Sequence, residues 1–115
     1  MSEILSNNNK KYIYRCNYKD DSILRNSFNS LTEKTYGFNF KQWYEDGYWE
    51  DKYIPYSLLD GDKVVSNVSV NIIDFLILGE RKRYIQIGTV MTDEEYRGQG
   101  LSRALMEVVL KEWEG

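Results

Sequence analysis

The feature of this sequence that most constrains its fold is a long stretch in which apolar residues recur at every second position, interrupted by two turn signals. The turns are Asp60-Gly61-Asp62 and Gly79-Glu80. The runs that flank them are residues 53–59, 63–78 and 82–92. Alternation of this kind places one set of side chains on each face of a strand, and Asp-Gly pairs favour tight hairpin turns. The pattern therefore predicts an antiparallel meander of three strands.

The sequence on both sides of the meander predicts helices and one further strand. Residues 12–16 are rich in β-forming residues. Asp21 and its polar neighbours offer N-cap oxygens to a helix that ends at Gly37, and Asn39 offers a cap to a short helix that ends near Gly47. Helical spacing returns over residues 101–113. We therefore expect an α/β (α+β) fold of order β-α-α-β-β-β-α, as one domain over residues 12–115 after a flexible tail at residues 1–11.

Composition excludes several classes of function. The net charge is −3, so the basic excess of a nucleic-acid or anionic-membrane binder is missing. Cys16 is the only cysteine and there is no histidine. An intrachain disulfide, a thiolate metal cluster and histidine-based catalysis are therefore excluded. Residues 1–9 lack the apolar core of a signal peptide, and the longest apolar run is far too short to span a membrane. We expect a cytoplasmic protein without a metal.

A polar loop with two glycines, residues 93–100, joins the last predicted strand to the last helix. Backbone N–H groups at a helix start lack intrahelical partners, which makes such a terminus a ready phosphate site. Arg97 adds a cation at its mouth. The loop lacks the Gly-Lys-Ser/Thr of a P-loop and the third glycine of a dinucleotide-binding fingerprint. A turn that needs glycine only for its geometry is the alternative.

The segment over residues 90–105, Val-Met-Thr-Asp-Glu-Glu-Tyr-Arg-Gly-Gln-Gly-Leu-Ser-Arg-Ala-Leu, resembles the acetyl-CoA-binding segment of the GCN5-related N-acetyltransferase (GNAT) superfamily. The family pattern is Arg/Gln-x-x-Gly-x-Gly/Ala. Arg97, Gly100 and Ser102 take its fixed positions, with serine in place of the last glycine or alanine. The upstream order of elements matches the family's N-terminal half. The family continues with a strand, a helix and a hairpin, so we expect this chain to be the N-terminal portion of a GNAT-like fold.

The resemblance implies acetyl-CoA as the acyl donor and a primary amine as the acceptor, without a metal. Arg97 and the backbone around the glycines would hold the pyrophosphate, through Gly98, Gln99, Gly100, Leu101, Ser102 and Arg103. The strand end would pair with the pantetheine arm through Val90, Met91 and Thr92. The Val90 amide would donate to the thioester carbonyl and stabilise the oxyanion while the amine attacks directly.

Two further sets of residues are candidates for the acceptor side. Some family members carry a glutamate four residues before the position of Val90. The residue here is Gln86, which cannot take a proton but can orient a water that does; a polar residue on a strand face is the alternative. Aromatic side chains beside four carboxylates would suit a cationic amine, or else form a core-covering helix with an acidic rim. These aromatic residues are Trp43, Tyr44, Tyr48 and Trp49.

The sequence thus favours an N-acetyltransferase or the cofactor-binding portion of one. The alternatives are a non-catalytic acyl-CoA-binding or interaction module and a scaffold whose loop binds nothing. In the complete family fold, the strand at residues 82–92 pairs on its second side with a later strand. We therefore expect an exposed strand edge here, which would recruit another strand and favour homo-oligomers.

Overall fold

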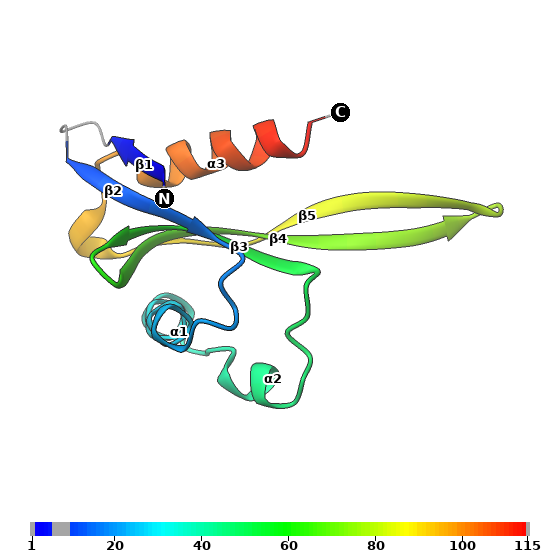
Figure 1. The fold of residues 1–115 in the computed structure, drawn as a ribbon, viewed down its shortest axis with the longest axis horizontal. Helices are drawn as coiled ribbons and strands as arrows, with labels where there is room; N and C mark the ends of the chain where they lie inside the picture. Colours follow the sequence, from blue (N-terminus) through cyan, green and yellow to red (C-terminus); the bar gives the residue numbers. More distant parts are fainter. Residues whose placement is uncertain (1, 6–9, 115) are drawn as a thin grey trace.

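The computed structural model describes residues 2–5 and 10–114. Its five-stranded antiparallel sheet has the order β1-β2-β3-β4-β5, with α1 and α2 on one face and α3 on the other (Figure 1). The elements are β1 Ser2–Leu5, β2 Lys11–Cys16, α1 Ser22–Tyr36, α2 Lys41–Glu45, β3 Tyr53–Asp60, β4 Lys63–Ile77, β5 Glu80–Thr92, the 3-10 turn η1 Glu94–Tyr96 and α3 Leu101–Glu112. The α+β class and the antiparallel meander predicted from the sequence are confirmed.

The helix boundaries follow from local capping. The Asp21 carboxylate accepts from the amides of Ile23 and Leu24, at 3.1 and 3.2 Å, and so starts α1. Gly37 ends the helix in the left-handed region, with φ 81°. The predicted cap of the second helix is displaced by one residue. Phe40 is the N-cap, while the Asn39 side chain accepts from the Lys41 amide at 3.0 Å.

The N-terminal segment differs from the expected tail. Residues 2–5 form β1, which pairs antiparallel with β2, and β2 begins at Lys11. The sheet therefore has one strand more than the sequence predicts. Other residues of the segment, Met1 and 6–9, lie outside the described part of the chain. The backbone of β1 pairs with that of β2. The polar composition of this segment does not predict such a strand.

Two hydrophobic clusters hold the layers together, one on each face of the sheet. The cluster under α3 consists of Tyr12, Tyr56, Leu58, Val65, Val68, Val70, Leu101, Leu105 and Val109. The cluster under α1 and α2 consists of Tyr18, Leu24, Phe28, Leu31, Trp49, Tyr53, Leu59, Val64 and Met91. Both clusters include residues from the part of β4 and β5 that the helices cover, which we call the body end. These residues are Val64, Val65, Val68, Val70 and Met91. The far end of this hairpin projects as an arm beyond the helices (Figure 1).

Candidate functional site

The end of β5 presents backbone groups at an open edge of the sheet. Among the described strands, β5 pairs with β4 alone. Pairs in an antiparallel ladder alternate between those that exchange backbone hydrogen bonds and those that do not. The Asp93 amide donates to the Val65 carbonyl at 2.8 Å. Counting back along the register from this pair, Thr92 and Val90 direct their N–H and C=O groups away from β4.

Two side-chain contacts agree with this orientation. The Tyr36 hydroxyl at the end of α1 donates to the Val90 carbonyl at 2.6 Å. The Arg97 Nε donates to the Thr92 carbonyl at 3.2 Å. Both carbonyls therefore face the open edge, where side chains rather than a strand reach them.

A β-bulge lies two residues upstream of this edge. Val68 pairs with Val90, while Val70 pairs with Ile87. One residue of β4 thus faces two of β5, Gly88 and Thr89. A Cβ at Gly88 would lie 3.3 Å from the Asn71 side chain and 3.7 Å from the Ser69 carbonyl, so the bulge is closely packed. Bulges bend a strand and re-aim the residues that follow them.

The loop after β5 is anchored by a buried carboxylate. Asp93 is 3% exposed. It accepts from the Glu95 amide at 3.0 Å and pairs with Lys34 at 3.1 Å and Lys63 at 3.6 Å. Burial alone would raise the pKa of the Asp93 carboxyl, but the Glu95 amide and the two lysines outweigh it and hold the pKa below its ordinary value. The carboxylate thereby fixes the start of η1 against α1 and β4.

Two tyrosines hold the rest of the loop. The buried Tyr12 hydroxyl on β2 donates to Gln99 Oε1 at 2.6 Å. Tyr96 stacks edge-on against Tyr12 and donates to Asp60 at 2.8 Å. The hydrogen bond to the Asp60 carboxylate raises the pKa of the Tyr96 phenol to about 12, so it stays protonated at neutral pH. Contacts from β2 and β3 therefore set the path of the glycine loop.

The loop ends at the N-terminus of α3 in a shape that leaves amides accessible. Gly98 and Gly100 both take left-handed φ angles, 81° and 74°, which residues with a side chain rarely adopt. Gly100 is the N-cap, and no side chain of the described residues caps the helix there. A surface hollow of about 340 Å³ opens at this point. It is lined by Thr92, Tyr96, Arg97, Gly98, Gly100, Leu101, Ser102 and Arg103.

The structure thus brings most of the cofactor residues predicted from the sequence together at one hollow. Gln99 differs, because its side chain is taken up by Tyr12. Leu101 and Met91 bury their side chains in the two clusters, so they can offer only backbone groups to a ligand. Gln86 is exposed on β5 opposite Asn71, on the arm side of the bulge.

The aromatic candidates lie on the α1 and α2 face of the sheet. Trp49 is 3% exposed and donates from Nε1 to the Tyr53 carbonyl at 3.2 Å, within the cluster that α1 covers. Trp43 stacks on Trp49, and Tyr44 is half-buried beside the Arg25 guanidinium. Tyr48 is 65% exposed. Tyr44 and Trp49 also line a surface hollow together with Lys19, Asp20, Glu50 and Asp51.

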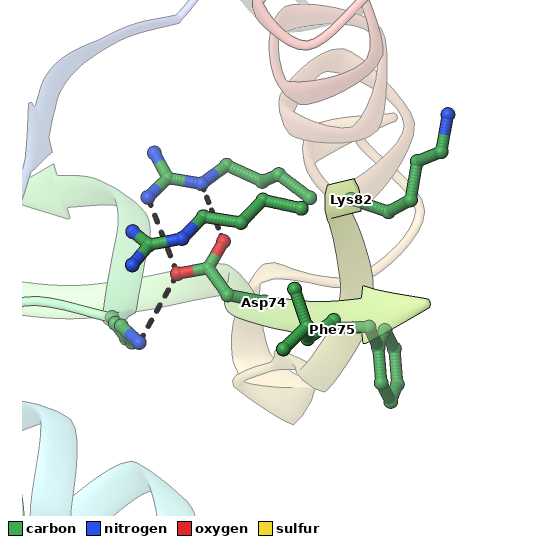
Figure 2. Close-up of a pocket in the computed structure, with 7 residues that line it drawn as sticks. Asp74, Phe75 and Lys82 are labelled. Atoms are coloured by element: carbon green, nitrogen blue, oxygen red, sulfur yellow. Dashed lines mark hydrogen bonds and ion pairs between the residues drawn. The ribbon is translucent and has the colours of Figure 1, made fainter. Parts of the chain in front are cut away.

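A third hollow, of about 470 Å³, lies on the β4–β5 arm, where an ion-pair cluster forms its floor (Figure 2). The Asp74 carboxylate accepts from Arg83 Nε at 2.8 Å and pairs with Lys52 at 3.1 Å, while Lys82 points away from it. Hydrogen bonds from Arg83 and then Lys52 lower the pKa of Asp74 to about 2. Asp74 is thus paired with two cations, and the cluster lies on the arm rather than at the glycine loop.

Within the described residues, no group of three or more His, Cys, Asp or Glu side chains is placed to hold a metal ion. In the same part of the chain, the helices are too short or too polar to cross a membrane.

Sequence reasoning missed several residues that shape this site. They include Tyr12, Tyr36, Asp93 and Asn67, whose side chain donates to the Thr89 carbonyl at the bulge at 3.1 Å. Tyr36 closes a helix, and nothing local connects it with a strand end. Asn67 was detectable as a polar residue inside the apolar run that holds Val64, Val65, Val68 and Val70. Asp93 was visible only as one of three consecutive acidic residues, of which the structure buries the first.

Comparison with known proteins gives one family and a consistent set of folds. A family model described as an acetyltransferase (GNAT) domain matches residues 21–115. No curated protein matches the chain significantly. Among solved structures, an aminoglycoside acetyltransferase from an uncultured soil metagenomic sample, in complex with sisomicin, superposes with a TM-score of 0.70 at 12% identity. The match covers 88% of this chain and 68% of that one.

Two further structures have the same fold. A GNAT family acetyltransferase from Staphylococcus aureus has a TM-score of 0.65 at 16% identity, over 88% of this chain and 76% of that one. A predicted acetyltransferase from Clostridium acetobutylicum, solved with acetyl-CoA, has a TM-score of 0.58 at 16% identity. That match covers 88% of this chain and 72% of that one.

Proposed function

The chain belongs to the acetyltransferase (GNAT) family, and on that premise we propose that it transfers the acetyl group of acetyl-CoA to a primary amine by direct attack. One observation carries this proposal. The uncapped N-terminus of α3, entered through two left-handed glycines, lies beside the open edge of β5. A site for a diphosphate and a site for an extended amide-bearing arm are therefore adjacent.

The glycine loop supplies the anion site. The first amides of a helix have no intrahelical acceptor, and the helix dipole adds partial positive charge at the same end. A Cβ at Gly98 would meet no atom within 4 Å, so the space before the loop is open to a ligand. Arg97 and Arg103 line the hollow and add two cations. We assign the pyrophosphate of coenzyme A to the amides over residues 98–103.

The open edge of β5 supplies the acyl site. Val90 and Thr92 present their amides outward, so a pantetheine arm can pair with them as a strand would. We assign the Val90 N–H to the thioester carbonyl. The amine nitrogen attacks the carbonyl carbon, the negative charge on oxygen is stabilised by this N–H, and the carbon–sulfur bond then breaks. The thiolate leaves with coenzyme A, and the amine gives up one proton.

That proton needs an acceptor, and we assign it to water. Gln86 is exposed four residues before Val90, where its amide can orient a water molecule. The hollow beside Tyr44 and Trp49 carries three carboxylates and two lysines, of which Lys19 pairs with Asp20 and Asp51, and its aromatic rings suit a cationic amine. We therefore propose as the acceptor a small amine that is cationic in solution. Its attacking nitrogen first loses the ammonium proton to water, because only the neutral amine has a lone pair for the attack.

The alternative is a non-catalytic acyl-CoA-binding module. The observation that favours it is Gln86 itself, because a glutamine cannot act as a general base. Such a protein would keep the diphosphate site and the pantetheine edge without turnover.

Calorimetry with acetyl-CoA and with coenzyme A, followed by thiol release with a panel of amines, tests these assignments. An acetyltransferase binds both ligands and releases free thiol only when an amine is present. Binding without thiol release from any amine supports the binding module. A chain that binds neither ligand overturns both.

A further inference from the structure

A chain of buried polar side chains crosses the interior of the sheet and ends at the β5 bulge. Asn67, on β4, is fully buried, as are Ser57 and Ser69. The Asn67 Nδ2 donates to the Thr89 carbonyl at 3.1 Å and to Ser69 Oγ at 2.8 Å. Its Oδ1 accepts from Ser57 Oγ at 2.7 Å. Three of the four hydrogen bonds that an asparagine side chain can make are therefore formed inside the core.

The hydrogen bonds of this buried network run in one direction from donor to acceptor. A serine hydroxyl carries one hydrogen, and that of Ser57 is directed to Asn67 Oδ1. The contact of 2.7 Å between Tyr18 and Ser57 is therefore donated by the Tyr18 phenol. Tyr18 is buried, and its burial raises the pKa of the phenol well above its ordinary value, so the donor keeps its proton. The Asn67 amide is consequently held with its oxygen toward Ser57 and its nitrogen toward the bulge.

The bulge is where this orientation matters. Thr89 is one of the two β5 residues that face a single β4 residue. Because the bulge inserts one residue, it decides which of the following residues turn their N–H groups inward. Without the inserted residue, Val90 would pair with Asn67 instead of Val68, which would turn the Val90 amide toward β4 and the Met91 amide toward the open edge. A second contact, Tyr53 to the Thr89 hydroxyl at 2.9 Å, holds the side chain but not the carbonyl.

We propose that Asn67 is a positioning residue for acetyl transfer, which fixes the bulge by binding the Thr89 carbonyl and so aims the Val90 N–H at the thioester. This inference rests on the proposed function, since it needs the Val90 amide as the oxyanion donor. A core asparagine without this role would contribute to folding alone. The two roles separate in the preference for acetyl-CoA over coenzyme A, because the Val90 contact exists only with the thioester.

The test compares Asn67→Ala with Ser57→Ala, each as the full chain. Asn67→Ala removes the three hydrogen bonds of the Asn67 side chain. Ser57→Ala removes the contacts with Tyr18 and with Asn67 Oδ1 but leaves the donor to Thr89 in place. Asn67→Asp serves as a second variant, since it keeps the side-chain volume and the acceptor to Ser57 while it removes both donors. The readouts are urea unfolding, the dissociation constants of acetyl-CoA and coenzyme A, and kcat and KM for thiol release.

We expect the Asn67 variants to lose the preference for acetyl-CoA and to lower kcat by about tenfold or more, as misplacing an oxyanion donor does. Their affinity for coenzyme A should stay within about threefold, a difference well under 1 kcal/mol. Ser57→Ala should lose stability and keep both the preference and kcat.

Several outcomes would overturn the proposal. The proposal is overturned if the Asn67 variants keep the preference for acetyl-CoA and the parent kcat. It is also overturned if Ser57→Ala loses the preference and kcat as much as they do. If the parent chain binds coenzyme A and acetyl-CoA equally well, Val90 makes no contact with the thioester and this inference fails. The proposed diphosphate site would not be affected by that result. If Asn67→Ala does not fold, Asn67→Asp decides the matter by the same ratio. A parent chain that binds neither ligand refutes the proposed function and the inference with it.

Discussion

The two halves of the β4–β5 hairpin share one backbone pairing and differ in everything around it. At the body end, Val68 is fully buried in the cluster under α3, and Asn67 is fully buried in hydrogen bonds with Ser57 and Ser69. On the arm, Leu76 is 72% exposed and Leu78 is wholly exposed. The ion pair between Asp74 and Arg83 bridges the arm at its surface.

This difference shows what a strand needs in order to keep a β-bulge in a fixed position. At the body end, packing on both faces and a buried polar network fix the backbone in more ways than pairing requires, so a bulge can persist. The arm has only pairing and solvent-exposed ion pairs, which contribute little to stability. We therefore expect substitutions at the body end and its loop to alter binding, and equivalent ones on the arm to leave it intact.

The largest effect should come from Gly100→Val, compared with Gly79→Val. Both glycines have left-handed φ angles, 74° and 82°. Each variant therefore strains the backbone to a similar extent, but only Gly100 lies at the N-terminus of α3. We expect Gly100→Val to weaken acetyl-CoA binding by roughly 100-fold or more, since the amides can no longer approach the diphosphate.

Calorimetry measures this contrast, with circular dichroism to establish that both variants fold. Gly79→Val should bind acetyl-CoA as the parent chain does, because the turn at the tip of the arm is remote from the loop. Equal losses in the two variants would mean that backbone strain alone, and not the position of the glycine, governs binding.

The second effect concerns Asp93→Asn. The substitution removes a buried carboxylate that holds the Glu95 amide and two lysines. We expect a loss of about 1–2 kcal/mol in the free energy of unfolding, typical of a lost hydrogen bond to a charged group, because asparagine can still accept from the Glu95 amide but has no charge to pair with the two lysines. Acetyl-CoA binding should weaken as well, because the start of the loop is released. Urea denaturation and calorimetry measure the two effects.

The same substitution has a pH signature. The pKa of Asp93 is lower in the folded chain than its ordinary value. Its contribution to stability is therefore complete above the unfolded pKa of about 3.9 and is lost as the pH falls through the folded pKa. Asp93→Asn should therefore lose less stability than the parent chain as the pH falls from about 5 to about 2. Parallel acid profiles for the two chains would show that Asp93 is not the group responsible.

The contrast between the two halves also explains what the sequence predicts well. The cap at Asp21, the end at Gly37 and the turns of the meander depend on neighbouring residues, and the structure has them where local chemistry places them. The glycine loop was recognisable because the diphosphate site that we propose for it would be built from consecutive backbone groups.

The remaining features of the site depend on partners far apart in the sequence. Tyr36 reaches Val90, and Tyr12 reaches Gln99. Such contacts are set by strand register and by the docking of α1, which alternation alone does not specify. A pattern of residue types therefore locates the glycine loop but not the groups that hold it in place.

The third effect should be smaller, and it concerns Tyr12→Phe. The substitution keeps the ring in its cluster and removes only the hydroxyl that binds Gln99 at 2.6 Å. We expect a loss of about 1 kcal/mol in stability and a weakening of acetyl-CoA binding by a few fold. Tyr14→Phe on the same strand is the matched control and should leave binding unchanged. If both variants bind like the parent chain, the Tyr12 anchor is dispensable for the loop.

The smallest effect should come from Asp74→Asn on the arm. The carboxylate has two basic partners and a pKa of about 2, so it is charged at neutral pH in the parent chain. It is nevertheless on the surface, where salt screens such pairs and their net contribution is small. We expect unchanged acetyl-CoA binding and a small loss of stability that disappears at high salt, measured by urea denaturation at two ionic strengths. Weakened binding in this variant would show that the arm is coupled to the glycine loop, because a local surface ion pair reaches no residue of that loop.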